Sequence, residues 1–151
     1  MSTPFHPALA PLVGSWRLCS ARTTFTDTGE VWETWGPHPE GCMVLDPGGR
    51  IMFLFTKPNR QPPTHDTERA TLFTELLAYT GLVRYDGPGR FITTVDVAKH
   101  PAEVGTEKLR LFTLEGDRLI ISIPKQVTTF TQGRLAVSEM VFVREQAANL
   151  A

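Results

Sequence analysis

The chain has 151 residues, which is the length of one ordinary globular domain. Its Lys and Arg residues (15) nearly balance its Asp and Glu residues (16), so the formal charge of −1 gives no electrostatic reason to expect a nucleic acid or an anionic membrane surface as a partner. No apolar run approaches the roughly 20 residues that a membrane-spanning helix needs.

The N-terminus and the cysteines both bear on the compartment. Residues 1–7 contain neither a basic stretch nor an apolar stretch, so we expect no secretory signal. Cys19 and Cys42 lie in expected strands and belong to no C-x-x-C pair, which favours buried, reduced thiols. These features predict a cytoplasmic protein.

Turn signals divide the chain into short segments rich in Val, Ile, Thr, Phe and Leu. The segments 46–49 (DPGG) and 86–89 (DGPG) are clear examples of such turns. Regularly spaced strands with tight connections predict an antiparallel sandwich or barrel. The expected strands cover residues 14–25, 30–35, 41–45, 50–56, 81–85, 90–98, 106–114, 118–124 and 135–144.

One stretch departs from this rhythm. Apolar residues at helical spacing predict a short helix over residues 67–80, which Asp66 or Thr67 can cap and Gly81 can end. The preceding segment 57–65 contains three prolines and is expected to be an irregular loop. A single helix among strands favours a lid or a plug on a barrel over a second domain.

The segment 51–55 (IMFLF) is apolar on both faces of its expected strand. A sheet with one solvated face would alternate apolar and polar residues, so this strand needs a second cover. The helix, a partner subunit or a dry lumen could each supply it. This observation motivates the hypothesis that the protein forms a homodimer.

Several motifs, taken in order, resemble those of the bacterial and fungal lipocalin-like domain family. Residues 14–16 form the Gly-x-Trp signature of lipocalins and other calycins, in which the Trp closes one barrel end and stacks near an Arg of the last strand, here Arg144. Further matches are the G-P-x-P-x-G turn at 36–41, the hairpin and loop at 49–62, Y-x-G at 79–81, G-T with a following Arg at 105–110, and G-D-x-L at 116–119.

The resemblance implies a closed antiparallel calycin-type barrel of about 8–10 strands with a cavity and the short helix around residues 67–80. It divides the chain into an N-terminal extension (1–11), the barrel domain (12–145) and a C-terminal tail (146–151). Some relatives with lipocalin-like folds are cyclases or isomerases of small hydrophobic natural products. Departures from the family pattern, such as Glu103 and Cys42 in place of aromatic residues, prevent the transfer of a whole site.

The residues give no sign of metal, nucleophilic or phosphate chemistry. The His residues 6, 38, 65 and 100 are scattered in loops without ligand spacing, so we expect no metal site. There is no G-x-S-x-G motif, and the Gly-rich turns precede strands where a phosphate site would need a helix. We therefore expect no metal, no cofactor and no Ser or Cys hydrolase, and no catalytic residue is assigned.

Arg110 is the most informative charged residue, because it shares a strand face with Phe112 and Leu114. If that face lines the lumen, Arg110 is a cation in a dry cavity, suited to a carboxylate or an enolate-like oxygen. Tyr79 could add a hydroxyl donor. Asp96 and Glu139 could act as bases if they point inward, and the alternative is that both carboxylates face solvent and Arg110 pairs on the surface.

Aromatic and sulfur side chains complete the expected cavity wall. The leading hypothesis is a barrel that binds a small hydrophobic molecule, with an acidic group met by Arg110. A cofactor-independent isomerase or cyclase that uses Arg110, Tyr79 and a lumen carboxylate is the first alternative, and a plugged dimerisation module is the second. The candidate ligand-binding residues are Arg110, Tyr79, Trp35, Phe53, Phe55, Phe112, Met140 and Phe142.

Overall fold

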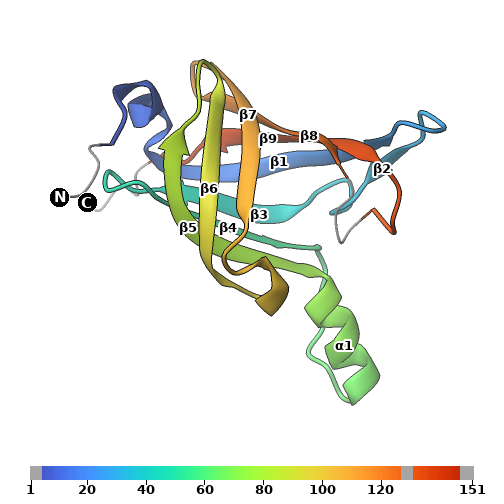
Figure 1. The fold of residues 1–151 in the computed structure, drawn as a ribbon. Helices are drawn as coiled ribbons and strands as arrows, with labels where there is room; N and C mark the ends of the chain where they lie inside the picture. Colours follow the sequence, from blue (N-terminus) through green and yellow to red (C-terminus); the bar gives the residue numbers. More distant parts are fainter. Residues whose placement is uncertain (1–4, 127–130, 147–151) are drawn as a thin grey trace.

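A computed structural model describes residues 5–126 and 131–146 of the chain (Figure 1). In these described residues, two 3₁₀ helices and one α-helix accompany nine strands. In chain order the elements are η1 (Pro7–Leu12), β1 (Gly14–Phe25), β2 (Val31–Glu33), β3 (Glu40–Leu45), β4 (Arg50–Thr56), α1 (Asp66–Thr74), β5 (Leu76–Tyr85), β6 (Arg90–Ala98), η2 (Pro101–Glu103), β7 (Glu107–Glu115), β8 (Arg118–Gln126) and β9 (Ala136–Arg144).

The strands form one antiparallel sheet that closes on itself. Its order is β2-β1-β3-β4-β5-β6-β7-β8-β9, and a further pairing of β1 with β9 joins the ends. Eight strands therefore make the barrel, while β2 pairs only with the second half of β1 and β3 with the first half. Closure removes the exposed sheet edges and confirms the predicted barrel.

Alternation along each strand sends large apolar side chains into the lumen. Along β4, for example, Ile51, Phe53 and Phe55 are buried, while Met52 and Leu54 between them are exposed. A fully apolar strand thus has one face in the core and one face in solvent. The predicted homodimer stays a prediction, and light scattering of the purified protein tests it.

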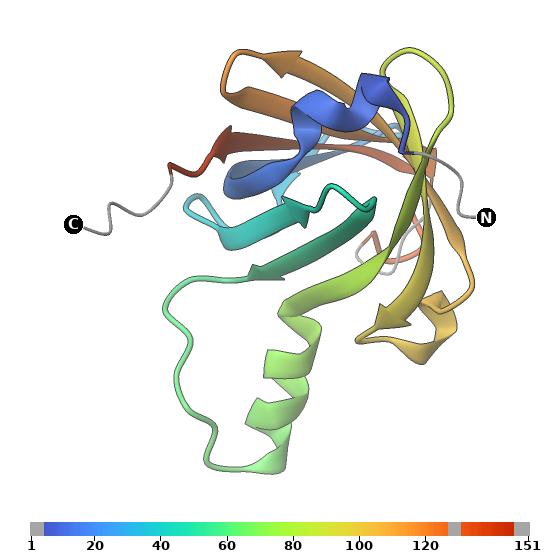
Figure 2. The ribbon, with the colours of Figure 1, turned by 90° about the vertical axis from the view of Figure 1, so that its left-hand side faces the viewer.

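One end of the barrel is sealed by the η1 segment, which lies across it in Figure 2. Leu9 and Leu12 of η1 are each 1% exposed, and Trp16 behind them is completely buried. The Trp16 indole Nε1 donates to the Leu12 carbonyl at 2.9 Å. The Arg144 guanidinium stacks on the indole 4.2 Å from the ring centroid, which confirms the predicted pair.

The α-helix is shorter than predicted and does not plug the barrel. It ends at Thr74, and the expected helical residues from Leu76 onward belong to β5, where Leu77 pairs with Phe55 and Tyr79 with Phe53. Pairing with β4 buries these apolar side chains better than an isolated helix could. No residue of α1 is buried, and Figure 2 shows the helix projecting away from the barrel.

The prediction for the cysteines is wrong for one of them. Cys19 is exposed, because the register of β1 against β9 shifts between Leu18 and Ser20 and leaves Cys19 as the extra residue of a bulge. Cys42 is partly buried, and burial raises the pKa of its thiol. Both thiols are free.

Among residues 5–126 and 131–146, no helix is long and apolar enough to cross a membrane.

Candidate functional site

A cavity of about 550 Å³ occupies the end of the barrel opposite η1 and opens to solvent there. Strands β1, β4, β5, β7, β8 and β9 contribute to its wall, and η2 and its flanking residues form part of its rim. The volume lies in the range of pockets that hold one small organic molecule. The barrel is therefore closed at one end and has a solvent-accessible cavity at the other.

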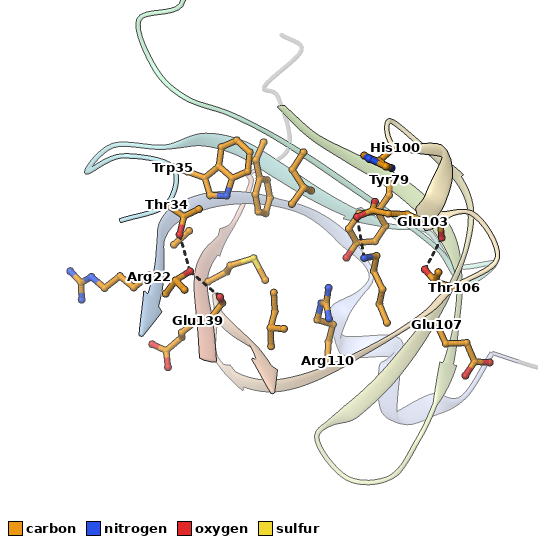
Figure 3. Close-up of a pocket in the computed structure, with 18 of the residues that line it drawn as sticks. Arg22, Thr34, Trp35, Tyr79, His100, Glu103, Thr106, Glu107, Arg110 and Glu139 are labelled. Atoms are coloured by element: carbon orange, nitrogen blue, oxygen red, sulfur yellow. Dashed lines mark hydrogen bonds and ion pairs between the residues drawn. The ribbon is translucent and has the colours of Figure 1, made fainter. Parts of the chain in front are cut away.

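Strand β7 brings two cations into this cavity. Because side chains alternate, Lys108 and Arg110 share the inward face with Phe112 and Leu114. Figure 3 shows Arg110 pointing into the barrel. Arg110 is only 5% exposed, which is unusual for an arginine.

The buried guanidinium of Arg110 is poorly satisfied. Its Nη1 donates to the carbonyl of the adjacent Leu109 at 2.8 Å, and its Nε is buried without a hydrogen-bond partner. Within the described parts of the chain, no carboxylate lies within 4.0 Å of Arg110. A buried cation without a counter-ion is costly, so the cavity presents a strong, unused attraction for an anion.

Tyr79 of β5 faces the same space. It is 6% exposed, and burial raises the pKa of its phenol above the ordinary value of 10.0, although the neighbouring Arg110 opposes this shift. Tyr79 is thus a neutral hydroxyl at physiological pH. It can donate a hydrogen bond to an oxygen placed beside Arg110.

Lys108 lies nearer the opening than Arg110. Its Nζ pairs with a carboxylate oxygen of Glu103 at 3.4 Å and lies 5.0 Å from the centroid of the Tyr79 ring. Burial lowers the pKa of Lys108, with a smaller contribution from Arg110 in the same direction, and the Glu103 carboxylate counters both. Glu103 thus pairs with Lys108, whereas no carboxylate of the described residues lies within 4.0 Å of Arg110.

Three hydroxyl groups lie on a different part of the cavity wall from Arg110. The Oγ1 atom of Thr23 in β1 lies 2.8 Å from Oγ1 of Thr34 and 2.9 Å from Oγ of Ser138 in β9. All three side chains line the cavity. The site therefore combines a cationic wall, a hydroxyl wall and apolar surface.

The comparison with known protein families agrees with this architecture. The model of the lipocalin-like domain family matches residues 13–145, which is most of the chain. The chain belongs to the lipocalin-like domain family. No curated protein matches it in sequence.

Two solved structures are similar to this lipocalin-like chain. One is a redesigned β-barrel with a TM-score of 0.47 and 14% identity, which covers 96% of this chain and 100% of its own. The other is Rv2717c from M. tuberculosis, with a TM-score of 0.46 and 14% identity, which covers 94% of this chain and 99% of its own.

Five of the eight candidate ligand-binding residues line the cavity of this lipocalin-like barrel. They are Arg110, Tyr79, Trp35, Phe55 and Met140. The remaining three lie among the core side chains toward the sealed end. Phe53 and Phe142 are fully buried, with ring centroids 6.4 Å apart, and Phe112 packs against Phe91.

The carboxylates of Asp96 and Glu139, which the sequence offers as bases, are directed away from the barrel lumen. Asp96 is exposed and forms a bidentate ion pair with Arg50 on the outer surface, and this guanidinium lowers the pKa of the carboxyl. Glu139 is also exposed, and Figure 3 shows it directed outward. Neither of these two carboxylates therefore supplies the lumen base of the enzymatic alternative.

Three of the four histidines of the chain cap the starts of helices. The Nδ1 atoms of His6, His65 and His100 accept backbone hydrogen bonds at the starts of η1, α1 and η2. In the part of the chain that the structure describes, no three His, Cys, Asp or Glu side chains gather as a metal site would require. These residues therefore have local structural roles.

Sequence reasoning missed Lys108, Glu103 and the three hydroxyls of the lipocalin-like site. Lys108 stands two residues before Arg110, so the alternation that placed Arg110 in the lumen also places Lys108 there. The contact of Thr23 with Ser138 joins residues 115 positions apart in the sequence. Only the closure of β1 on β9 brings those two hydroxyls together.

Proposed function

We propose that this lipocalin-like barrel binds a small, mainly apolar organic acid, with the carboxylate at Arg110. The observation that carries the proposal is a guanidinium 5% exposed, with an unpartnered Nε and no neighbouring carboxylate among the described residues, in a cavity open to solvent. A carboxylate beside Arg110 supplies both the missing charge and an acceptor for Nε. The neutral Tyr79 hydroxyl is a further donor to it.

The rest of the cavity favours an apolar body for this ligand. Trp35 and Phe55 meet edge to face with ring centroids 5.9 Å apart, and Leu77, Ile123 and Met140 add aliphatic surface. About 550 Å³ holds a molecule of ordinary metabolite or drug size. The free thiols of Cys19 and Cys42 fit a reducing compartment, so we place this binding in the cytoplasm, which cell fractionation tests.

Isothermal titration calorimetry tests the proposal directly. Phenylalkanoic acids of stepped chain length serve as probes, and the amide of each acid is its uncharged match. We expect the acids to bind the native protein more tightly than their amides. In Arg110→Met the acids lose about 10- to 100-fold in affinity, because their carboxylate is buried without a counter-charge.

Arg118→Met is the matched control for this substitution. Arg118 stands at the start of β8, outside the cavity, and its side chain is 53% exposed. The control is expected to bind the acids like the native protein. Equal affinity for acids and amides in the native protein would overturn the proposal.

A further inference from the structure

The three hydroxyls of Thr23, Thr34 and Ser138 form a chain whose middle member is Thr23. Thr23 is 6% exposed, and it contacts Thr34 at 2.8 Å and Ser138 at 2.9 Å. Threonine and serine pairs across neighbouring strands are common on solvated sheet surfaces. This chain instead faces the lumen, beside Trp35 and Met140, where each unused polar atom is harder to accommodate.

Counting hydrogens shows that the chain is incomplete. Each hydroxyl carries one hydrogen, so three hydroxyls have three hydrogens for the two hydrogen bonds between them. Within the chain, one O–H hydrogen and several lone pairs have no partner. Among the described residues, these hydroxyls make no further hydrogen bond. The direction of the two bonds can also reverse, so either end can present the free hydrogen.

The position of the chain relates it to Arg110. Around the ring of strands, β1 is three places from β7, with β9 and β8 between them. Figure 3 shows Thr34 and Arg110 on different sides of the cavity. Met140 of β9 and Ile123 of β8 form an apolar strip between the two polar walls. A ligand that reaches both walls must therefore be polar at two places and apolar between them.

We propose that the hydroxyl chain is a second polar subsite, which selects acids that carry a hydroxyl or carbonyl oxygen across an apolar body from the carboxylate. This inference rests on the proposed function, because the carboxylate at Arg110 orients the ligand. A ligand hydroxyl can donate to a lone pair of the chain, and a ligand carbonyl can accept the free hydrogen. An acid without the second oxygen leaves that hydrogen unused at the apolar wall.

The test compares pairs of probes that differ by one oxygen. Phenylalkanoic acids of stepped chain length and their para-hydroxy counterparts are titrated by calorimetry into the native protein and into Thr23→Val, which removes the middle hydroxyl at nearly constant shape. Thr24→Val is the matched control, because Thr24 is the next residue of β1 and is exposed on the outer face. Thermal unfolding of each variant confirms that it is folded before titration.

We expect the para-hydroxy acid to bind about two- to tenfold more tightly than its parent at the chain length that spans the cavity. This advantage disappears in Thr23→Val and persists in Thr24→Val. A merely structural role of Thr23 would weaken parent and hydroxy acid equally and keep their ratio. An advantage that survives in Thr23→Val, or no advantage at any length while parent acids bind, overturns the subsite alone. If no acid binds the native protein, the proposed function and the subsite fall together.

Discussion

The two ends of the barrel each hold an arginine against an aromatic or apolar surface, and the two arginines are satisfied very differently. At the sealed end, Arg144 stacks on Trp16, pairs with Asp117 at 3.3 Å and donates to the carbonyls of Pro11 and Val13. At the open end, Arg110 donates from Nη1 to the carbonyl of its own neighbour Leu109, and its Nε is buried without a hydrogen-bond partner. The contacts of Arg144 give it a structural role, and the unpartnered Nε of the buried Arg110 supports the ligand-binding role proposed for that residue.

The same contrast holds for the packing of the two ends. Around Trp16 the side chains of Leu9, Leu12 and Leu45 are almost completely buried, whereas the walls near Arg110 border a cavity. The sealed end is thus expected to contribute more to stability, because the open end has a cavity in place of packed side chains. Four measurements can break or sharpen this division, from the largest expected effect to the smallest.

Trp16→Ala has the largest expected effect. It removes a completely buried indole, so we expect the free energy of unfolding to fall by about 3–5 kcal/mol. Trp35→Ala at the open end is expected to cost about 1–3 kcal/mol, since the cavity beside Trp35 means that fewer contacts are lost. Urea denaturation measures both values. Equal losses would contradict the division between the two ends.

Arg144→Met tests the structural arginine. The substitution leaves the Pro11 and Val13 carbonyls without their donor, and we expect a loss of about 2 kcal/mol in the free energy of unfolding. The exposed Arg118 is again the control, because Arg118→Met is expected to change stability by less than about 0.5 kcal/mol. Ligand affinity should stay unchanged in both variants. A neutral Arg144→Met would remove the contrast.

Arg110→Met is expected to act in the opposite direction. It replaces a buried, uncompensated charge by an apolar side chain of similar length, so the ligand-free protein gains about 1–2 kcal/mol of stability. Thermal unfolding without ligand measures this gain. A large destabilisation would show that Arg110 supports the fold, and the site would then lose its main argument.

Tyr79 gives the smallest effect, a spectroscopic one. In Tyr85→Phe the remaining tyrosine is Tyr79, and its ultraviolet absorbance should change with a midpoint above pH 10.0, because burial raises its pKa. The folded protein holds this proton more tightly than the unfolded chain does. The associated stability is therefore complete below the unfolded pKa and is lost as pH rises through the folded pKa.

A bound acid is expected to shift the midpoint of this titration. Its carboxylate cancels the Arg110 charge that favours the phenolate, so saturation with a phenylalkanoic acid should move the midpoint further upward. The double variant Tyr85→Phe, Tyr79→Phe is the blank. A midpoint at the ordinary value, unmoved by ligand, would place the Tyr79 hydroxyl outside the site.

Most of the barrel could be predicted from the sequence because its turns and alternation are local signals. The bounds of β1, β4 and β6 agree with the prediction to the residue. The helix was extended too far because Leu76 and Leu77 fit a helical stripe as well as a buried strand. Pairing with β4, which is not a local property, decides between the two.

The candidate site could be predicted only where one strand carries the signal. Arg110 can be singled out because Phe112 and Leu114 follow it on the same strand face. Asp96 and Glu139 were ambiguous, since a strand pattern does not say which face turns inward, and both face outward. The hydroxyl chain joins β1, β9 and Thr34, a set that exists only after the barrel has closed.

The η1 segment decides at which end of the barrel a ligand can enter. With Leu9, Leu12 and Trp16 closing one end, the ligand proposed above enters at the opposite end, where η2 forms part of the rim. Its carboxylate enters first to reach Arg110, so its apolar end lies nearest the opening. Acids with added bulk at the apolar end are then expected to bind, and acids with the same bulk next to the carboxylate are not.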